Sequence, residues 1–224
     1  EKVKIVLEIK NLRKSFSSNC VLDDISCSFS KGKIIALLGK NGSGKTTFLK
    51  CIGNIMNIDD GEIEYNDSNF IFINDKPNMF GDLTIYENLR YILSIYNQEF
   101  DLDRYQNSIK DLGLNSMQSI RLKHLSAGNI QRNKILIALN TNWEYLLIDE
   151  PFSNLDKEGS IIIKGILSNL KSQNKTVLFS THNFMDISGN NSPRTRSAYF
   201  WSCPWSIVSL RCDSNNLDAF LVNN

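Results

Sequence analysis

The chain contains 224 residues, with 25 Lys and Arg against 24 Asp and Glu, which gives a formal net charge of +1 at pH 7. This length suffices for one large α/β domain or two small ones, and the balanced charge argues against a nucleic-acid-binding surface or an acidic tail. Five scattered cysteines without C-x-x-C spacing indicate reduced cytosolic thiols, and the sequence shows neither a secretory signal nor the roughly 18 consecutive apolar residues of a membrane-spanning helix.

The first third of the chain is predicted to consist mainly of strands. Residues 3–9 alternate between apolar and polar positions, and residues 20–29 do so loosely, which is typical of half-buried strands. The apolar run at 33–38 is short enough for a buried strand, and residues 47–52 read as the opening of a helix. Two further strands are expected next to turn residues, at 62–65 and 69–73.

A glycine-rich loop between the strand at 33–38 and the following helix fits the pattern G-x-x-x-x-G-K-[ST]. Its residues are Gly39, Lys40, Asn41, Gly42, Ser43, Gly44, Lys45, Thr46 and Thr47. Glycines let backbone N–H groups turn towards a polyphosphate, and the helix N-terminus adds a favourable dipole. Lys45 would lie along the β- and γ-phosphates, and the Thr46 hydroxyl would ligate Mg²⁺. The alternative is a turn with an accidental lysine, but both flanking elements favour phosphate binding.

The middle of the chain changes to a helical period. Apolar residues recur at helical spacing from Ile85 to Tyr96, with Thr84 as the expected cap and Glu87 completing a capping box. A second, weaker helix is expected at 102–112, so residues from about 81 to 125 are predicted to form a helical insertion. Strands then return at 145–148 and 176–179, separated by a helix at 159–170. This alternation predicts a parallel sheet with helices packed on its faces.

Two carboxylates, Asp149 and Glu150, follow the apolar strand at 145–148. Open α/β sheets place their ligands at the carboxyl ends of strands, where these side chains would lie. Asp149 is suited to hold Mg²⁺, directly or through its water shell, and Glu150 to polarise an attacking water as general base. Two acids after a strand are more often a solvated turn, but the phosphate loop upstream favours the catalytic interpretation.

Three more motifs accompany these acids, in the order Leu125–Asn129, Ser153–Asp156 and Ser180–His182. In this order and spacing, the chain from about residue 3 to 187 resembles the ATP-binding subunits of ABC transporters. Their signature reads L-S-G-G-Q, their D-loop reads S-A-L-D, and their switch histidine follows an apolar strand. The resemblance implies an α/β fold, a P-loop NTPase (RecA-like) core with an antiparallel β subdomain and an inserted α-helical subdomain, over residues 1–187.

The resemblance also implies roles for two residues outside the phosphate loop and the acidic strand. Phe16 would be the aromatic platform for adenine, although a phenylalanine after a strand is more often a core residue. His182 would contact the γ-phosphate and help to hold Glu150 and the water in line. His124, next to the signature, matches no role in the pattern and is expected on the solvated surface.

In the family, the signature faces the γ-phosphate bound by the opposite subunit, so two chains enclose two ATP molecules. Ser126 and Gly128 are the residues expected in that role here, because a hydroxyl and N–H groups at a helix start form an anion site. Asp156 would lie at the same interface. The partner would be a second ATP-binding subunit, in a homo- or heterodimer, and a monomer should hydrolyse ATP poorly. The alternative for residues 125–129 is an ordinary helix cap, with Ser126 as the capping residue.

Two segments depart from the family pattern in ways that bear on partner and direction. Asp75 stands where the family usually has a glutamine, and it could approach Mg²⁺ as a shorter oxygen ligand. The stretch that follows, residues 79–84, resembles the segment that receives the coupling helix of the membrane partner. Ala127 and Asn129 replace a glycine and a glutamine of the signature, and similar signatures occur in exporters, so export is favoured over import.

The segment 188–224 is an atypical C-terminal tail. It contains no Lys and no Glu, but two of the three tryptophans and two of the five cysteines. Such a shift in composition can mark a linker or a partner-binding segment. It can equally mark a reading-frame change or an artefact, since an aromatic cluster suits neither a linker nor a solvated tail.

Taken together, the sequence predicts an ATPase that uses ATP and Mg²⁺ to power a separate transmembrane permease, bound at the cytoplasmic face of the cell membrane. No nucleic acid is expected as a partner. One alternative is a soluble ABC-type ATPase that acts on nucleic acid or ribosomes, which nucleic-acid-stimulated ATPase activity would favour. Another is a regulatory module that binds ATP with little turnover, which an unchanged turnover on replacing Glu150 would favour.

Overall fold

The structure is a computed structural model that describes residues 5–66, 69–74, 79–183, 206–213 and 216–222, the last two stretches as backbone only. The strands are β1 (Ile5–Phe16), β2 (Asn19–Ser30), β3 (Ile34–Leu38), β4 (Asp60–Tyr65), β5 (Phe70–Ile73), β6 (Tyr145–Ile148), β7 (Thr176–Thr181), β8 (Ser206–Asp213) and β9 (Asn216–Val222). The α-helices are α1 (Lys45–Ile52), α2 (Ile85–Ile95), α3 (Leu102–Asp111), α4 (Ala127–Asn140) and α5 (Lys157–Ser172). Of the helices in the described part of the chain, none is both long enough and apolar enough to cross a bilayer.

Two sheets organise the molecule. The smaller sheet has the order β2-β1-β4 and is antiparallel, and the larger has the order β5-β6-β7-β3-β8-β9. Strands β5, β6, β7, β3 and β8 run parallel, whereas β9 pairs antiparallel with β8. The predicted parallel sheet is therefore confirmed. The first strand is longer than the sequence pattern indicated, because it continues through a bulged pairing with β2 as far as Phe16. Phe16 thus ends a strand, whereas the sequence pattern placed it after one.

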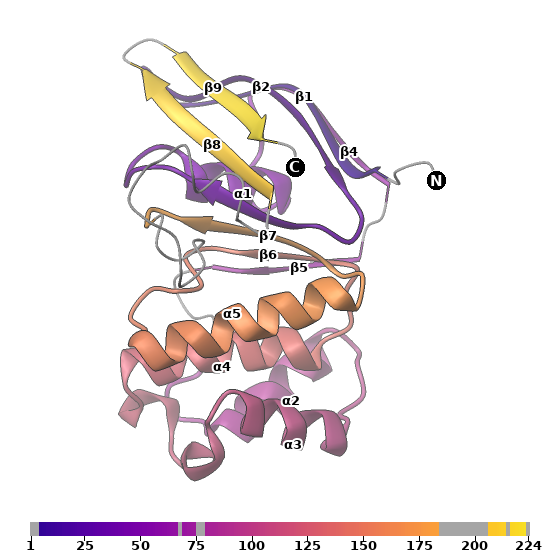
Figure 1. The fold of residues 1–224 in the computed structure, drawn as a ribbon, viewed down its shortest axis with the longest axis vertical. Coiled ribbons are helices and arrows are strands. Elements are labelled where there is room, and N and C mark those ends of the chain that lie inside the picture. Colours follow the sequence, from indigo (N-terminus) through magenta and orange to yellow (C-terminus); the bar gives the residue numbers. More distant parts are fainter. Residues whose placement is uncertain (1–4, 67–68, 75–78, 184–205, 214–215, 223–224) are drawn as a thin grey trace.

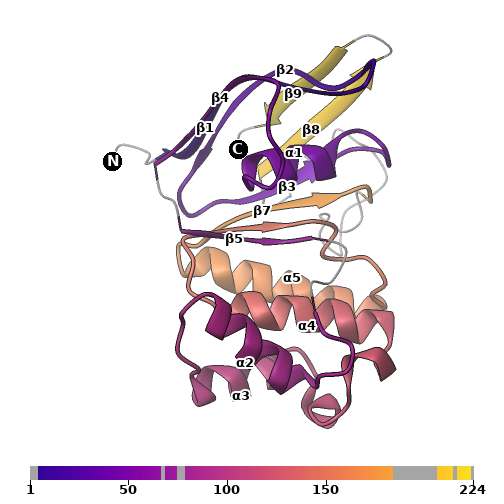
Figure 2. The same ribbon diagram turned by 180° about the vertical axis from the view of Figure 1, so that it is seen from behind.

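The layers explain why β3 lacks the alternation of a half-exposed strand. Helix α1 lies between the two sheets, while α4 and α5 cover the opposite face of the larger sheet, with α2 and α3 beyond them (Figures 1 and 2). Ile34 and Ala36 of β3 face the core formed with α4 and α5, and Ile35 and Leu37 face the core formed with α1 and β2. Both faces of the strand are buried, so its run of apolar residues is continuous.

The helical insertion contains the two predicted helices, α2 and α3, and its predicted capping box is confirmed. The Thr84 hydroxyl accepts a hydrogen bond from the Glu87 N–H at 3.3 Å, and the Glu87 carboxylate accepts one from the Thr84 N–H at 2.8 Å. Residue Thr84 also forms a β-bridge with Arg121, so the start of α2 is joined to the segment that leads into α4.

Three cysteines in the described side chains are free thiols, as the sequence analysis predicted. Cys20 is exposed, while Cys27 and Cys51 are buried. Burial raises the pKa of Cys27 to about 12 and that of Cys51 to about 11, so neither thiol is a nucleophile at neutral pH.

The tail contributes backbone to the larger sheet. Strand β8 pairs in parallel with β3, with Ile35 opposite Ser206 and Leu38 opposite Ser209, and β9 follows as the edge strand. Two paired antiparallel strands, β8 and β9, thus lie within the atypical segment. The reading-frame change or artefact stays a prediction, which resequencing of the coding DNA tests.

Candidate active site

Three neighbouring strands, β6, β7 and β3, bring the predicted motifs to one edge of the larger sheet. Because these strands are parallel, their carboxyl ends lie side by side. The phosphate loop follows β3, the two acids follow β6, and His182 follows β7. A hydrogen bond from the Gly39 N–H to the Thr181 carbonyl, 3.3 Å long, joins the first and third of these segments. The fold therefore places the loop, the acids and the histidine together.

The phosphate loop has the backbone that anion binding needs. Gly42 and Gly44 have φ angles of 82° and 84°, in the left-handed region that favours glycine. Gly44 is the N-cap residue of α1 and offers no side-chain bond to the first turn, so the N-terminal N–H groups there are left to a ligand. The Ser43 hydroxyl is buried and, within the described residues, has no hydrogen-bond partner. These features fit a bound phosphate group, whose oxygens would accept hydrogen bonds from the N–H groups of α1 and from the Ser43 hydroxyl.

The side chain of Lys45, the first residue of α1, folds back onto the loop. Its side chain is only 6% exposed, and its ammonium group donates to the carbonyl oxygens of Gly39 and Lys40 at 2.9 and 3.1 Å. The same group lies 3.6 Å from Glu150 Oε1. A buried cation held in this way is positioned to contact an anion that the loop encloses.

Thr46 and Asp149 meet directly beside the loop. The Thr46 hydroxyl donates to Asp149 Oδ2 at 2.8 Å, and the Ser180 hydroxyl donates to Asp149 Oδ1. Asp149 is 1% exposed, and Ser180 is fully buried. A hydroxyl oxygen next to a carboxylate is the donor set with which proteins hold Mg²⁺ together with substrate phosphates. The residues present therefore fit the metal that the sequence analysis predicted.

Glu150 adopts a strained backbone and faces two partners. Its φ angle is 49°, a left-handed conformation that costs of order 1–3 kcal/mol for a residue other than glycine. One carboxylate oxygen lies near Lys45, and the other lies 3.0 Å from His182 Nδ1. The side chain is 19% exposed, so it reaches solvent at the mouth of the site. This arrangement suits a general base that shares its water with the switch histidine.

Sequence reasoning missed two residues that hold this glutamate. The Ser180 hydroxyl accepts a hydrogen bond from the Glu150 N–H at 2.9 Å, and the Gln131 side chain donates to the Glu150 carbonyl at 3.2 Å. Ser180 entered the sequence analysis only as the start of the motif that contains His182. No local pattern marks either contact, because the partners lie 30 and 19 residues apart in the chain.

The signature and the D-loop form a separate concavity of about 380 Å³. Ser126 caps α4 by accepting a hydrogen bond from the Asn129 N–H at 3.2 Å, which both interpretations of the segment allow, and Ser126 itself remains exposed. A Cβ atom built on Gly128 would come within 3.0 Å of the Asn154 carbonyl, which explains why a glycine fits there. Asp156 caps α5 through the Gly159 N–H. Of the described residues lining the concavity, none belongs to the phosphate loop.

The remaining predicted residues have different surroundings. Phe16 is 45% exposed at the end of β1, and its ring lies 5.8 Å from the Lys14 ammonium group. A Cβ on Gly44 would come within 3.1 Å of Val21, so β2, the partner strand of β1, lies against the phosphate loop.

The other predicted residues differ in exposure. Asn41 is exposed and Thr47 half-buried, and His124 is exposed as predicted. The site assignment of Asp75 lies outside the described residues.

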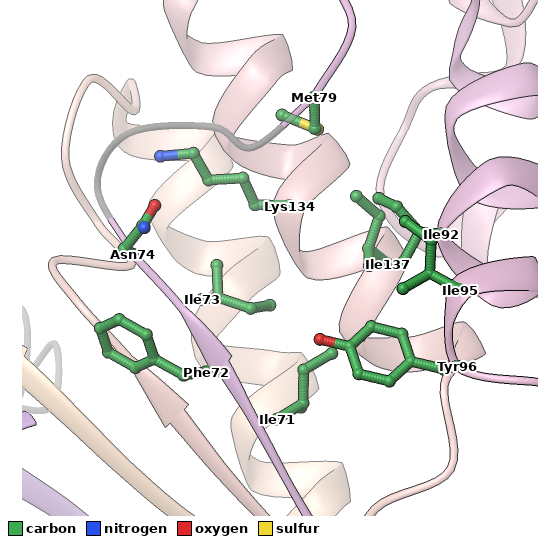
Figure 3. A pocket seen from close by; sticks show the side chains of 10 residues that line it. All are labelled: Ile71, Phe72, Ile73, Asn74, Met79, Ile92, Ile95, Tyr96, Lys134 and Ile137. Carbon is green, nitrogen blue, oxygen red and sulfur yellow. The ribbon is translucent and has the colours of Figure 1, made fainter. Parts of the chain in front are cut away.

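An apolar pocket of about 230 Å³ opens between β5, α2 and α4 (Figure 3). Ile73 of β5, Ile95 of α2 and Ile137 of α4 line it, and Met79 lies at its rim. The Lys134 ammonium group points towards Asn74 at one end. The pocket thus lies between the helical insertion and the strand that precedes the Asp75 segment.

Comparisons with known proteins agree with this geometry. The model of the family described as ABC transporter matches residues 22–153. The chain belongs to the ABC transporter family. An ATP-binding protein of a phosphonates import system in Fusobacterium nucleatum is 28% identical over 208 residues, which cover 81% of this chain and 84% of that protein. An ATP-binding protein of the lipopolysaccharide export system in Escherichia coli K12 is 30% identical over 193 residues, 79% of this chain and 80% of that protein.

Solved structures of ABC proteins have the same fold. A putative ABC transporter ATP-binding protein from Pyrococcus furiosus aligns with a TM-score of 0.71 and 25% identity, over 79% of this chain and 91% of that one. An ATP-binding subunit of another ABC transporter aligns with a TM-score of 0.76 over 97% of this chain and 90% of that one, and its 24% identity shows the fold alone. The predicted P-loop NTPase fold is confirmed. This ABC subunit is an ATPase that binds ATP and couples its hydrolysis to transport. ABC ATP-binding subunits work with transmembrane permease subunits.

Proposed function

We propose that this ABC subunit binds Mg²⁺ and ATP at the phosphate loop and hydrolyses the nucleotide when a second ATP-binding subunit closes over it. The observation that carries the proposal is the position of Glu150, which lies between Lys45 and His182 at 3.6 and 3.0 Å. Base, cation and switch histidine converge at one edge of the sheet, which is the arrangement that in-line attack by water on a γ-phosphate requires.

Each of these side chains has a task that its contacts support. Lys45 and the free N–H groups of α1 bind the phosphates, and the Ser43 hydroxyl donates to a phosphate oxygen. Bound Mg²⁺ supplies charge neutralisation at the phosphates, and Thr46 and Asp149 are the residues that would hold it. Glu150 orients and polarises the attacking water.

The adenine end and the rest of the loop complete the nucleotide site. Phe16 presents an exposed ring for stacking, on the hairpin whose second strand contacts the phosphate loop. His182 keeps Glu150 and the water in line. The flanking loop residues Gly39, Asn41, Gly42, Gly44 and Thr47 contribute backbone, and Asp75 is proposed as a further Mg²⁺ ligand.

The second subunit is proposed because the signature concavity stands apart from the phosphate loop. Ser126 and Gly128 begin α4 at a surface that residues of the same chain leave exposed or half-buried. A γ-phosphate bound to the other subunit would complete this surface, and Asp156 would lie at the same interface. The partner is a second copy of the chain or a related subunit.

The permease is proposed to dock at the apolar pocket of Figure 3, on the cytoplasmic side of the membrane. The pocket adjoins Met79, the first residue of the stretch that resembles the coupling-helix receptor. Phe80, the next residue, is exposed and packs edge to face on exposed Tyr91 with ring centroids 4.7 Å apart, so this stretch also presents apolar surface to solvent. Ala127 and Asn129 favour export over import. Residues 1–187 form the nucleotide-binding domain in this proposal, with its helical subdomain at about 81–125.

Replacing Glu150 with Gln tests the central proposal. The substitution removes the base but keeps a side chain of the same size, so ATP should bind while hydrolysis falls by about 100-fold or more. The bound γ-phosphate then persists, and a dimer should accumulate with Mg²⁺ and ATP in size-exclusion chromatography with light scattering. Glu99→Gln, which changes an exposed glutamate of the helical insertion, is the matched control.

Two outcomes would contradict the proposal. If Glu150→Gln leaves turnover unchanged, Glu150 is not the general base. If the ATP-bound variant stays monomeric, the proposed closed dimer does not form.

For the partner, we expect a polytopic membrane protein to copurify with the chain. ATPase activity that nucleic acid stimulates would instead support the soluble alternative.

A further inference from the structure

Helix α4 connects the signature to the catalytic base of the same chain. Its N-terminus is capped by Ser126 of the signature, and Gln131 follows about one and a half turns later. We infer that Gln131 is a positioning residue for Glu150, through which the engagement of the signature by the partner's nucleotide sets the geometry of this chain's own base. The inference rests on the proposed dimer.

The backbone of Glu150 is held from two sides. Its N–H donates to the Ser180 hydroxyl at 2.9 Å, and that hydroxyl donates its own proton to Asp149, so each bond fixes the direction of the other. Its carbonyl accepts from the Gln131 amide at 3.2 Å and from the Ser153 N–H at 3.1 Å. A left-handed φ of 49° is strained for glutamate and persists only where surrounding contacts impose it.

Gln131 is suited to impose this conformation because it is itself immobilised. The residue is 2% exposed, although glutamine is a side chain that normally lies in solvent. It comes from α4, an element different from the strand and the turn that carry Glu150. The contact with Ser153 belongs to the local turn, so it moves with Glu150. The hydrogen bond from the Gln131 amide is therefore the contact that fixes the position of α4 relative to the catalytic turn, residues 150–153.

The next residue of α4 makes a second connection. Arg132 Nη2 lies 3.3 Å from Asp156 Oδ1, and its Nη1 donates to the Leu112 carbonyl at 3.4 Å. Asp156 in turn caps α5. The signature helix is thus linked to the catalytic turn at Glu150 and to the D-loop at Asp156 by adjacent side chains. A shift of α4 when Ser126 and Gly128 engage a phosphate is transmitted to the carboxylate that faces Lys45 and His182.

The substitution Gln131→Met tests the inference, because it keeps the volume and removes the amide donor. In the purified full chain, at concentrations that support the ATP-dependent dimer, we expect kcat to fall between about 10- and 100-fold. The KM for ATP should change less than about twofold, since the Gln131 amide bonds to the Glu150 carbonyl and not to the phosphate loop. Gln173→Met, at an exposed glutamine of α5's C-terminus, is the matched control.

A double-substitution cycle separates positioning from a general structural role. In the Glu150→Gln background, the carboxylate that Gln131 positions is gone, so adding Gln131→Met should leave the residual rate unchanged. An equal loss of kcat in both backgrounds, or a loss of nucleotide binding with kcat retained, would overturn the inference. If Gln131→Met does not fold, Gln131→Leu gives the same test, because it also removes the amide donor without burying a charge. If Glu150→Gln alone does not form the ATP-bound dimer, the proposed function is contradicted. That outcome is distinct from the results above, which contradict only the role of Gln131.

Discussion

Two regions of the molecule differ in how their side chains are held. In the phosphate-loop region, which comprises residues 39–47, 149–150 and 180–182, side chains at or beyond the ends of three different strands bond to one another. In the signature region, which comprises residues 125–129 and 153–156, side chains bond mainly to the ends of their own helices. Thr46 and Ser180 both donate to Asp149, and Lys45 and His182 both approach Glu150. Ser126, by contrast, caps α4. The first region is assembled within one chain. The second offers N–H groups and a hydroxyl at an exposed concavity, which suits recognition of a ligand held by another molecule.

This difference predicts that substitutions in the two regions separate nucleotide binding from turnover. A change in the phosphate-loop region should affect both quantities, because the same side chains are proposed to bind the phosphates and to act on the attacking water. A change in the signature region should leave binding to the single subunit intact and remove the turnover that needs a dimer. Both quantities are measurable on one purified chain, by fluorescent-nucleotide binding and by phosphate release.

The largest effect is expected for Lys45→Ala. Loss of the buried ammonium group removes the charge next to the β- and γ-phosphates, so ATPase activity should fall on the order of 1000-fold, with weaker ATP binding. Phosphate release and titration with a fluorescent ATP analogue measure the two losses. Lys50→Ala, in the last turn of the same helix, should change neither by more than about twofold. Normal ATP affinity in the Lys45 variant would contradict the proposal that the phosphate-loop region binds the phosphates of ATP.

Gly128→Asp should strongly reduce turnover but leave ATP binding intact. Its Cβ would come within 3.0 Å of the Asn154 carbonyl, and its carboxylate would oppose a phosphate at the signature. We expect ATPase activity to fall about 100-fold, while the single subunit binds the ATP analogue within about twofold of wild type. The matched control is Gly165→Asp in α5, where an added Cβ meets nothing within 4 Å. If the Gly128 variant lost ATP binding as strongly as it lost ATPase activity, the two regions would not differ in the way proposed here.

The smallest effect is expected for Thr84→Ala, at the start of the insertion that leads to the signature. Loss of the capping hydroxyl should lower the free energy of unfolding by about 1 kcal/mol at pH 7, measured by urea denaturation, and leave ATP binding unchanged. Thr84→Ser should restore the stability.

The capping box also predicts a dependence on pH. Hydrogen bonds from the Thr84 N–H and hydroxyl hold the pKa of Glu87 below its usual range. Its stabilisation is therefore present above the unfolded-state pKa of about 4.3 and is lost as the pH falls through the lower folded-state pKa. The difference in unfolding free energy between wild type and Thr84→Ala should shrink in that acidic window. A constant difference between pH 7 and pH 3 would contradict the reciprocal cap.

Sequence reasoning reached the parts of the site that local chemistry specifies. A glycine-rich loop between a strand and a helix, acids after an apolar strand, and a Thr84–Glu87 box are each contained within a few residues. It fell short where β1 continues to Phe16, because that extension depends on bulged pairing with β2 and β4. The structure supplied the Ser180 and Gln131 contacts to Glu150, which no spacing along the chain encodes.

By itself, the sequence determined that this chain binds a nucleotide, which strands precede the predicted motifs, and that it resembles an ABC subunit. Turn geometry, glycine backbone and helix capping are local properties, so the residue types at these positions suffice to predict them. The tertiary structure alone decided how the strand ends meet and which buried side chains hydrogen-bond to the strained backbone of Glu150. Contacts between segments 19 to 103 residues apart depend on the packing of the whole core around the sheet.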